Sequence, residues 1–287
     1  MFNTIDHFCI PGTTVCEDHI GFSKDFLFVI DGASGLSGVN VTSDLNDSAW
    51  FADNLCVSLK NRLSENKEIS DILKDITVDL QKQYAQFARE KNLIIPPDSP
   101  SASISVFRLK DNFLEYFGLG DCVANIQSFD LTIKTLRDDK LSKLDAIVIS
   151  KMIQIHESDG VSILEARKQC TPMLMTHREK RNMPDGYWTL DLSGKGINHA
   201  KKHREKVNSV RSISLYSDGF SQLTNVFRIY SNDAALHAAI QAHTGEVLLE
   251  SLLKMQEDDP DANAFPRFKF RDDISLIFAE VRPLSFV

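Results

Sequence analysis

The stretches "ASISVFRL" (102–109) and "FLEYFGLG" (113–120) decide the predicted fold, because apolar side chains recur with period two along both. This period is typical of strands with one buried face. The polar residues 110–112 separate the two stretches, so we expect an antiparallel hairpin. Two further strand-like stretches, 122–129 and 131–136, extend the hairpin into a meander.

Helical patterns lie on both sides of this meander. Apolar residues recur at helical spacing over 46–63, and a second apolar stripe runs from Ile69 to Phe87 with Ser70 as the expected N-cap. The other expected elements are helices at 141–156 and after Val161, an irregular stretch ending in a strand at 187–192, a strand at 209–219, helices at 234–243 and 244–255, and a closing strand at 273–281.

This order of elements favours stacked antiparallel sheets covered by helices over a parallel doubly wound sheet. The expected class is therefore α+β. A chain of 287 residues is longer than most domains but is compatible with one two-sheet domain. We expect a single domain over 1–287.

Composition limits the classes of function. A hydrophobic content of 43% and a formal charge of −8 indicate a globular chain that is not a general nucleic-acid binder. We find no apolar run of membrane-spanning length and no signal-peptide pattern. Five cysteines without C-x-x-C spacing favour a reduced, cytoplasmic location. The basic run 202–206 is interpreted as a solvated helix face, and His199 and His203 as exposed helical residues.

Acidic residues follow or precede several strand-like runs. Asp-Gly occurs at four places, and alone it predicts only a turn. Among the four, only Asp31 and Asp218 directly follow such runs, while Asp272 and Asp273 directly precede the closing one. If the closing strand is antiparallel to the first two, these carboxylates meet at one sheet edge. Asp121 joins them if its strand runs in the same direction as the first two.

Ionised carboxylates brought together repel one another unless cations neutralise them. All-oxygen ligands select hard divalent ions such as Mg²⁺ or Mn²⁺. Asp31 is the expected bridge between two such ions, and Gly32 can offer its backbone carbonyl. The acidic pair Glu17 and Asp18 is placed to bind metal-bound waters. Such a pair of ions would activate a water and polarise a phosphoryl oxygen.

In these residues the chain resembles the metal-dependent type 2C Ser/Thr protein phosphatases. The similar motifs occur in the family's order across nearly the whole chain. They are the acidic pair at 17–18, "VIDGASG" (29–35), "SPSASISVF" (99–107), "FGLGDCVANI" (117–126), "LYSDGF" (215–220) and "RDDISLIF" (271–278).

The resemblance implies a four-layer αββα sandwich with a binuclear Mg²⁺ or Mn²⁺ centre at one end and a variable flap near residues 155–200. It implies that Asp31, Asp218 and Asp272 are the catalytic metal ligands. Gly32 would add its carbonyl, Glu17 and Asp18 would act through water, and Asp121 would serve a third metal. Asp273 lies where the family commonly has Asn or Asp.

Two positions depart from the family's pattern. Thr13 stands where an arginine often binds the substrate phosphate, and Ala33 stands where eukaryotic members often have a histidine that is proposed as general acid. His19 is a candidate proton donor, although a strand-end histidine is the simpler interpretation. Arg178 and Arg181 could bind phosphate instead of the missing arginine, with surface charges as the simpler interpretation.

The resulting hypothesis is a phosphoprotein phosphatase that hydrolyses phosphoserine or phosphothreonine without a phosphoenzyme. One alternative is a regulatory or scaffold protein that keeps the fold without turnover. Another is a hydrolase of a small phosphorylated metabolite. The expected partner is a phosphorylated protein, with neither nucleic acid nor membrane.

Overall fold

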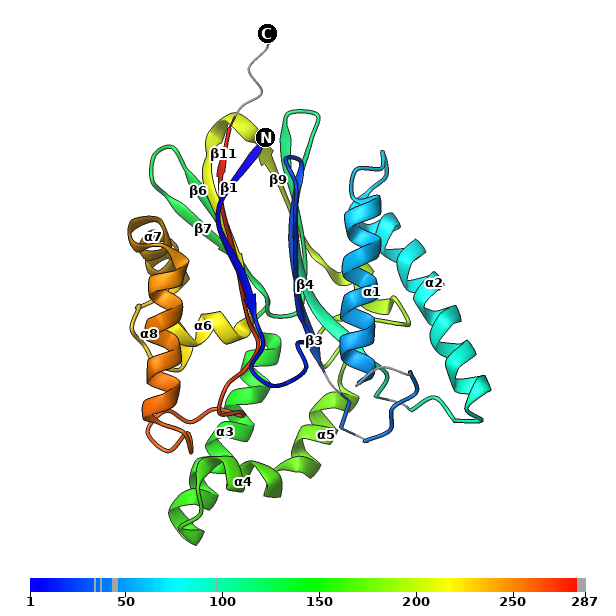
Figure 1. Cartoon of the computed structure of the whole chain (residues 1–287), viewed down its shortest axis with the longest axis vertical. Helices are drawn as coiled ribbons and strands as arrows, with labels where there is room; N and C mark the ends of the chain where they lie inside the picture. The colour runs from blue at the N-terminus through cyan, green and yellow to red at the C-terminus, as the bar shows by residue number, and fades with distance from the viewer. Residues whose placement is uncertain (34, 37, 43–45, 97, 283–287) are drawn as a thin grey trace.

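Two antiparallel sheets pack face to face in the computed structural model, which describes residues 1–33, 35–36, 38–42, 46–96 and 98–282 (Figure 1). The first sheet has the order β1 (Phe2–Ile10), β11 (Ile274–Val281), β10 (Val210–Tyr216), β6 (Val123–Ser128), β7 (Ile133–Leu136). The second has the order β2 (Asp18–Phe22), β3 (Phe26–Ala33), β4 (Ser101–Lys110), β5 (Phe113–Leu119), β9 (Lys201–Lys206), and the short β8 (Leu190–Asp191) pairs with β4.

The predicted hairpin is confirmed as β4 and β5, paired in antiparallel register. Asp111 and Asn112 both have positive φ, at 50° and 63°, which suits a tight turn that follows the twist of the strands. The meander does not stay in one sheet, however, because the chain crosses to the first sheet between β5 and β6. Gly120 makes this crossing possible: its φ is +80°, and a Cβ there would lie 2.1 Å from Ser103 Oγ.

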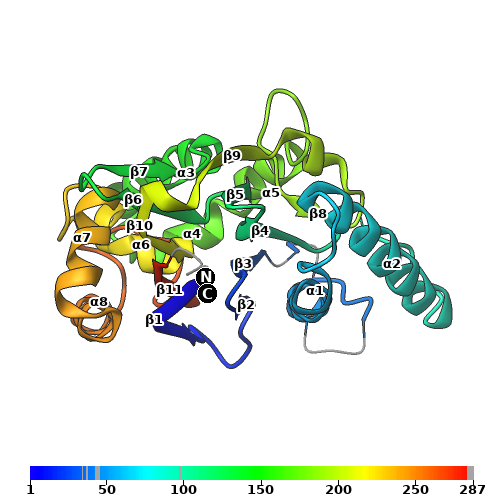
Figure 2. The ribbon, with the colours of Figure 1, turned by 90° about the horizontal axis from the view of Figure 1, so that it is seen from above.

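Helices cover the outer faces of both sheets, as Figure 2 shows from above. The second sheet is covered by α1 (Asp47–Arg62) and α2 (Ile69–Glu90), and the first by α6 (Asp218–Asn225), α7 (Asp233–His243) and α8 (Gly245–Asp258). At one end lie α3 (Lys140–Asp159), α4 (Ile163–Gln169) and α5 (Thr171–Glu179), and short 3₁₀ turns occupy Lys195–His199 and Val207–Ser209. The predicted αββα sandwich is confirmed.

Alternation along the strands divides the core into layers. In β3, Leu27 and Val29 face the first sheet, while Phe28 and Ile30 face α1 and α2. All four side chains are fully buried, each contributing about 1.5–3 kcal/mol relative to an exposed side chain. Asp31 continues the row of Leu27 and Val29, so its carboxylate lies at the end of the inter-sheet layer.

Three local predictions were wrong. The basic run 202–206 is part of the edge strand β9 and not a helix. Ser70 does not cap α2, which begins at Ile69 after Glu68. The chain also has α6 directly after β10, where no helix was expected. Within the described part of the chain, no helix is long and apolar enough to cross a membrane.

Candidate metal centre

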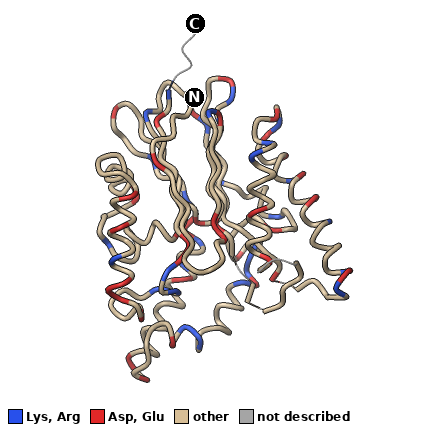
Figure 3. The backbone as a smooth tube through the Cα atoms, in the orientation of Figure 1, with Lys and Arg blue, Asp and Glu red and all other residues tan. Residues whose placement is uncertain are grey.

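The predicted acidic residues meet at one end of the sandwich, where acidic positions lie between the lower ends of the two sheets (Figure 3). Asp18 begins β2 and is the cross-strand partner of Asp31 on β3. Asp218 follows β10, and Asp272 precedes β11. Because β10 and β11 are antiparallel, the end of one lies beside the start of the other.

The prediction that these residues share one sheet edge was wrong. Asp18 and Asp31 belong to the second sheet, whereas Asp218 and Asp272 flank strands of the first. The carboxylates therefore converge across the interface between the sheets. The sequence predicts where strands end, but it does not assign each strand to a sheet.

Asp121 joins the cluster, because its strand β5 runs in the direction that the sequence-based prediction required. Strand β4 is antiparallel to β3, and β5 is antiparallel to β4, so β5 runs in the direction of β3 and ends at the same side. Asp121 follows β5 and is fixed by Ser103, whose hydroxyl donates to Asp121 Oδ1 at 2.6 Å. Ser103 is itself the cross-strand partner of Asp31.

Burial and mutual repulsion disfavour the charged form of these acids. Burial raises the pKa of both Asp31 and Asp218 well above the usual range, and neighbouring carboxylates, first Asp218 for Asp31 and first Asp272 for Asp218, raise it further. Burial also raises the pKa of Asp18 to about 7, although the hydroxyls of Ser217 and Ser275 act to lower it. Without cations, the cluster therefore tends to bind protons, because its surroundings do not compensate the charge of the fully ionised acids.

Divalent cations fit this donor set. The candidate ligand atoms of the acidic side chains are all carboxylate oxygens, which Mg²⁺ and Mn²⁺ prefer. Asp18 Oδ2 is buried and has no hydrogen-bond partner among the residues that the structure describes, which is costly for a carboxylate unless a cation approaches it. Among the described residues, no three His, Cys, Asp or Glu side chains form a ready-made cage for one ion. The carboxylates therefore surround the site, but they are not arranged as a complete coordination shell for one ion.

Asp273 positions the acidic pair, a role that the sequence did not reveal. Its Oδ1 accepts from the Gly12 backbone N–H at 2.7 Å, and its Oδ2 accepts from the Glu17 N–H at 2.6 Å. These bonds tie the β1–β2 connection to the start of β11. The sequence placed Asp273 before the closing strand, at a position where the resembling family has Asn or Asp, but its partners lie more than 250 residues away.

Glu17 and Gly32 lie against each other. The Gly32 N–H donates to the Glu17 carbonyl at 3.0 Å, and a Cβ at Gly32 would lie 2.7 Å from that same oxygen. Only glycine fits this close approach. Glu17 Oε1 accepts from Asn46 Nδ2 at 2.8 Å, and Asn46 is also the N-cap of α1.

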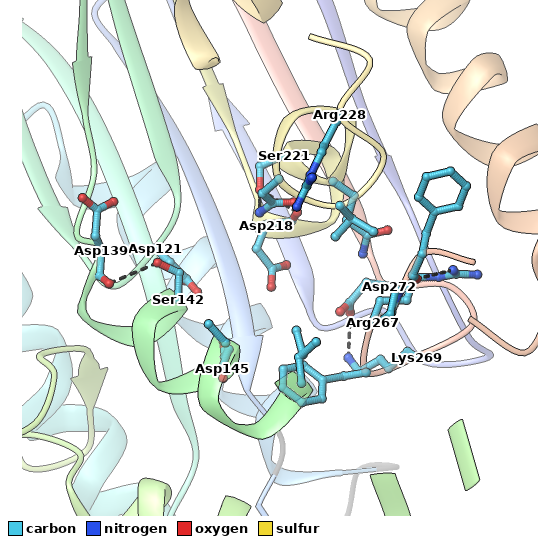
Figure 4. A pocket seen from close by; sticks show the side chains of 18 of the residues that line it. Asp121, Asp139, Ser142, Asp145, Asp218, Ser221, Arg228, Arg267, Lys269 and Asp272 are labelled. Atoms are coloured by element: carbon cyan, nitrogen blue, oxygen red, sulfur yellow. Dashed lines mark hydrogen bonds and ion pairs between the residues drawn. The ribbon is translucent and has the colours of Figure 1, made fainter. Parts of the chain in front are cut away.

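A cavity of about 640 Å³ opens onto the acidic residues. Asp121, Asp218 and Asp272 line it together with Asp145, which projects from α3 (Figure 4). Burial raises the pKa of Asp145 to about 7, and the charge of Asp121 adds to the shift. Asp145 was not predicted, because it lies inside a helical pattern without a strand end to mark it.

Thr13 and the proposed replacements His19 and Arg181 do not line the cavity. Thr13 is exposed, and its hydroxyl bonds to the Val15 carbonyl. The Arg181 side chain is only 7% exposed and donates to the Ser99 carbonyl at 2.7 Å, so it anchors a loop. His19 alternates with Asp18 along β2 and faces α1, where burial lowers its pKa.

Arg178 lies on α5, where its charge lowers the pKa of Asp145. His199 is exposed, as expected, and ends the 3₁₀ turn Lys195–His199, whereas His203 is half-buried and lies on a strand instead of a helix. His199 stacks on Trp188 with ring centroids 3.4 Å apart, and His203 lies on β9 at 3.1 Å from Glu205 Oε1.

No family model matches the sequence, and no curated protein matches it. Solved structures do match over nearly the whole chain. The serine/threonine phosphatase Stp1 from Staphylococcus aureus aligns with 99% of this chain and 96% of its own, with a TM-score of 0.56 and 15% identity. The phosphatase PstP/Ppp from Mycobacterium tuberculosis aligns with 99% of both chains, with a TM-score of 0.54 and 13% identity.

A further similar structure is the catalytic domain of the phosphatase PstP in complex with two manganese ions. It aligns with 99% of this chain and 98% of its own, with a TM-score of 0.53 and 15% identity. The chain therefore has the fold of these serine/threonine phosphatases, which is the fold that the resemblance predicted.

Proposed function

We propose that this protein is a metal-dependent phosphatase that hydrolyses phosphoserine or phosphothreonine in proteins. The observation that carries the proposal is the convergence of five aspartates from the ends of both sheets, three of which line one cavity, in a fold shared with serine/threonine phosphatases. The five are Asp18, Asp31, Asp121, Asp218 and Asp272.

The chain's residues have distinct roles in this proposal. Asp31, Asp218 and Asp272 would hold two Mg²⁺ or Mn²⁺ ions together with the Gly32 carbonyl. Glu17 and Asp18 would accept hydrogen bonds from coordinated water, and Asp121 would contribute to a third ion. Bound ions of this kind supply a nucleophilic water and polarise the phosphoryl oxygens.

The whole chain would act as one catalytic domain. Residues 155–200, which include α4, α5 and β8, would form the variable flap beside the cavity. Arg181 supports this proposal, because its bond to the Ser99 carbonyl joins the segment to the chain just before β4.

Hydrolysis of a phosphoserine peptide, measured with and without Mn²⁺, tests the function. We expect turnover that needs the metal, and its loss in D31N, because the amide removes one negative ligand. Asp185 provides a matched control, since it is also followed by glycine but is exposed and does not line the cavity. D185N should retain wild-type turnover.

A metal-binding protein without turnover on any phosphopeptide would contradict the proposal for these substrates. Turnover confined to nucleotides or sugar phosphates would instead identify a hydrolase of small metabolites. A failure to bind Mn²⁺ at all would favour the scaffold alternative.

A further inference from the structure

The cavity beside the acidic cluster is also lined by basic side chains, and two of them form ion pairs with carboxylates outside the cluster. Arg137 pairs with Asp139 at 2.7 Å and with Asp233 at 2.9 Å. Arg267 is buried and pairs with Asp259 at 2.8 Å. Lys269 and Arg228 are the exposed basic residues that line the described part of the cavity (Figure 4).

Lys269 lies directly against the acidic cluster. Its ammonium donates to Asp272 Oδ1 at 2.6 Å, while 47% of its side chain remains exposed. Its charge also acts on Asp218 and Asp31. Lys269 therefore contacts one carboxylate of the cluster directly and is also open to the cavity.

The segment that carries Lys269 is fixed on both sides. Arg267 donates to the carbonyls of Phe265 at 3.0 Å and Phe270 at 3.2 Å, which closes the loop on itself. Arg271 donates to Gln256 Oε1 at 3.2 Å on α8. Because the backbone is held on both sides, the ammonium is presented to the cavity without a large loss of loop entropy.

We propose that Lys269 binds the phosphate group of the substrate, and that it competes with the divalent cation for Asp272. This inference rests on the proposed function, because it names the residue that recognises the phosphate at the same site. A phosphate dianion that enters a ring of carboxylates is repelled unless positive charge lies beside it. Without a metal, the ammonium neutralises Asp272; when a divalent ion takes that carboxylate, the ammonium becomes free to face the phosphate.

The competition predicts opposite effects of one substitution on two affinities. K269Q removes the competing charge, so the metal-free protein should bind Mn²⁺ about tenfold more tightly, in keeping with the loss of one charged hydrogen bond. Inorganic phosphate should bind the Mg²⁺-saturated variant about tenfold more weakly for the same reason. Calorimetry measures both without turnover.

Two other variants separate charge from structure. K269R keeps the positive charge and should stay within about threefold of wild type in both affinities, since a charged donor to the same oxygen remains. Lys254 is exposed on α8 and does not line the cavity, so K254Q should leave both affinities unchanged. Circular dichroism and thermal unfolding confirm that each variant is folded.

The inference is overturned if folded K269Q binds Mn²⁺ no more tightly than wild type. It is also overturned if K269Q binds phosphate normally while R228Q does not, because Arg228 would then be the phosphate ligand. Both affinities can be measured in a protein without activity, so failure of the proposed function would appear separately, as absent hydrolysis by wild type.

Discussion

Asp31 illustrates how far a single residue could be interpreted from the sequence. Its position after an apolar run predicted a carboxylate at a strand end, and β3 places it there. The same reasoning identified Asp218 and Asp272. Asp273 was singled out with Asp272, but its positioning role was not predicted, and Lys269 was missed. Both roles depend on contacts that no local pattern marks: Asp273 bonds to the distant β1–β2 connection, and Lys269 lies in an irregular loop.

Asp273 provides the first prediction at this scale. D273A leaves the N–H groups of Gly12 and Glu17 without their acceptor, so the free energy of unfolding should fall by about 2–4 kcal/mol. Mn²⁺ affinity should fall as well, because the acidic pair is no longer held. D273N keeps one acceptor oxygen, so its free energy of unfolding and its Mn²⁺ affinity should lie between those of wild type and D273A. Wild-type stability and Mn²⁺ affinity in D273A would refute the positioning role.

Because of His237, we expect the free energy of unfolding to depend on pH for a reason that does not involve the acidic cluster. The ring is fully buried between Ser212 and Ser214, and burial lowers its pKa to about 4. Since the unfolded chain protonates this group near pH 6.5, it binds more protons than the folded state between pH 6.5 and 4. Stability should therefore be lost as pH falls through this window, by about 3 kcal/mol.

Urea unfolding of wild type and H237Q, measured at several pH values between 7 and 4, tests this expectation. The wild-type free energy of unfolding should fall more steeply than that of the variant as the solution is acidified. Equal slopes would show that His237 does not titrate on unfolding.

At the scale of elements, the long amphipathic helices and the hairpin were predictable, whereas β9 was not. The spacing of four residues between His199 and His203 suggested one helix face, but His199 ends a 3₁₀ turn and only His203 lies on β9. Residues 201–206 form a strand because they pair with β5, and the Arg204 guanidinium lies 3.8 Å from the centroid of the Phe113 ring on that strand. The sequence contains no signal for such a long-range pairing.

The N-cap residue of helix α1, Asn46, also contacts the candidate metal centre. Asn46 Oδ1 accepts from the Ala49 N–H at 2.6 Å, while its amide donates to Glu17. N46A loses both bonds and should lower the free energy of unfolding by about 1 kcal/mol or more. N46S keeps a capping oxygen but loses the donor to Glu17.

Comparing the two variants separates stability from positioning. N46S should unfold within a few tenths of a kcal/mol of wild type, yet both variants should bind Mn²⁺ more weakly because Glu17 loses its partner. Wild-type Mn²⁺ affinity in both variants would show that the bond from Asn46 does not position Glu17.

For the whole molecule, the cluster creates an opposition between stability and function. Each sheet contributes acids to one inter-sheet site, and the raised pKa values of Asp31 and Asp218 mean that their charged forms are disfavoured there. The general sandwich was predictable from the order of elements. The convergence across two sheets was not, because strand order alone does not say which strands share a sheet.

This opposition gives a prediction for thermal unfolding. In a chelator, D31N should melt at a higher temperature than wild type, because a buried repelling charge is removed. Added Mn²⁺ should stabilise wild type, by about 2.7 kcal/mol at a hundredfold excess over the dissociation constant, and should stabilise D31N far less. A D31N protein that melts below wild type in chelator would contradict the electrostatic account.

The central claim is that acids from both sheets form one site for divalent cations. Calorimetric titration of the metal-free protein with Mn²⁺ measures this directly, with D31N and D185N beside wild type. The account predicts two bound ions for wild type and D185N, and loss of this binding in D31N. The absence of Mn²⁺ binding to wild type, or equal binding by D31N, would contradict it.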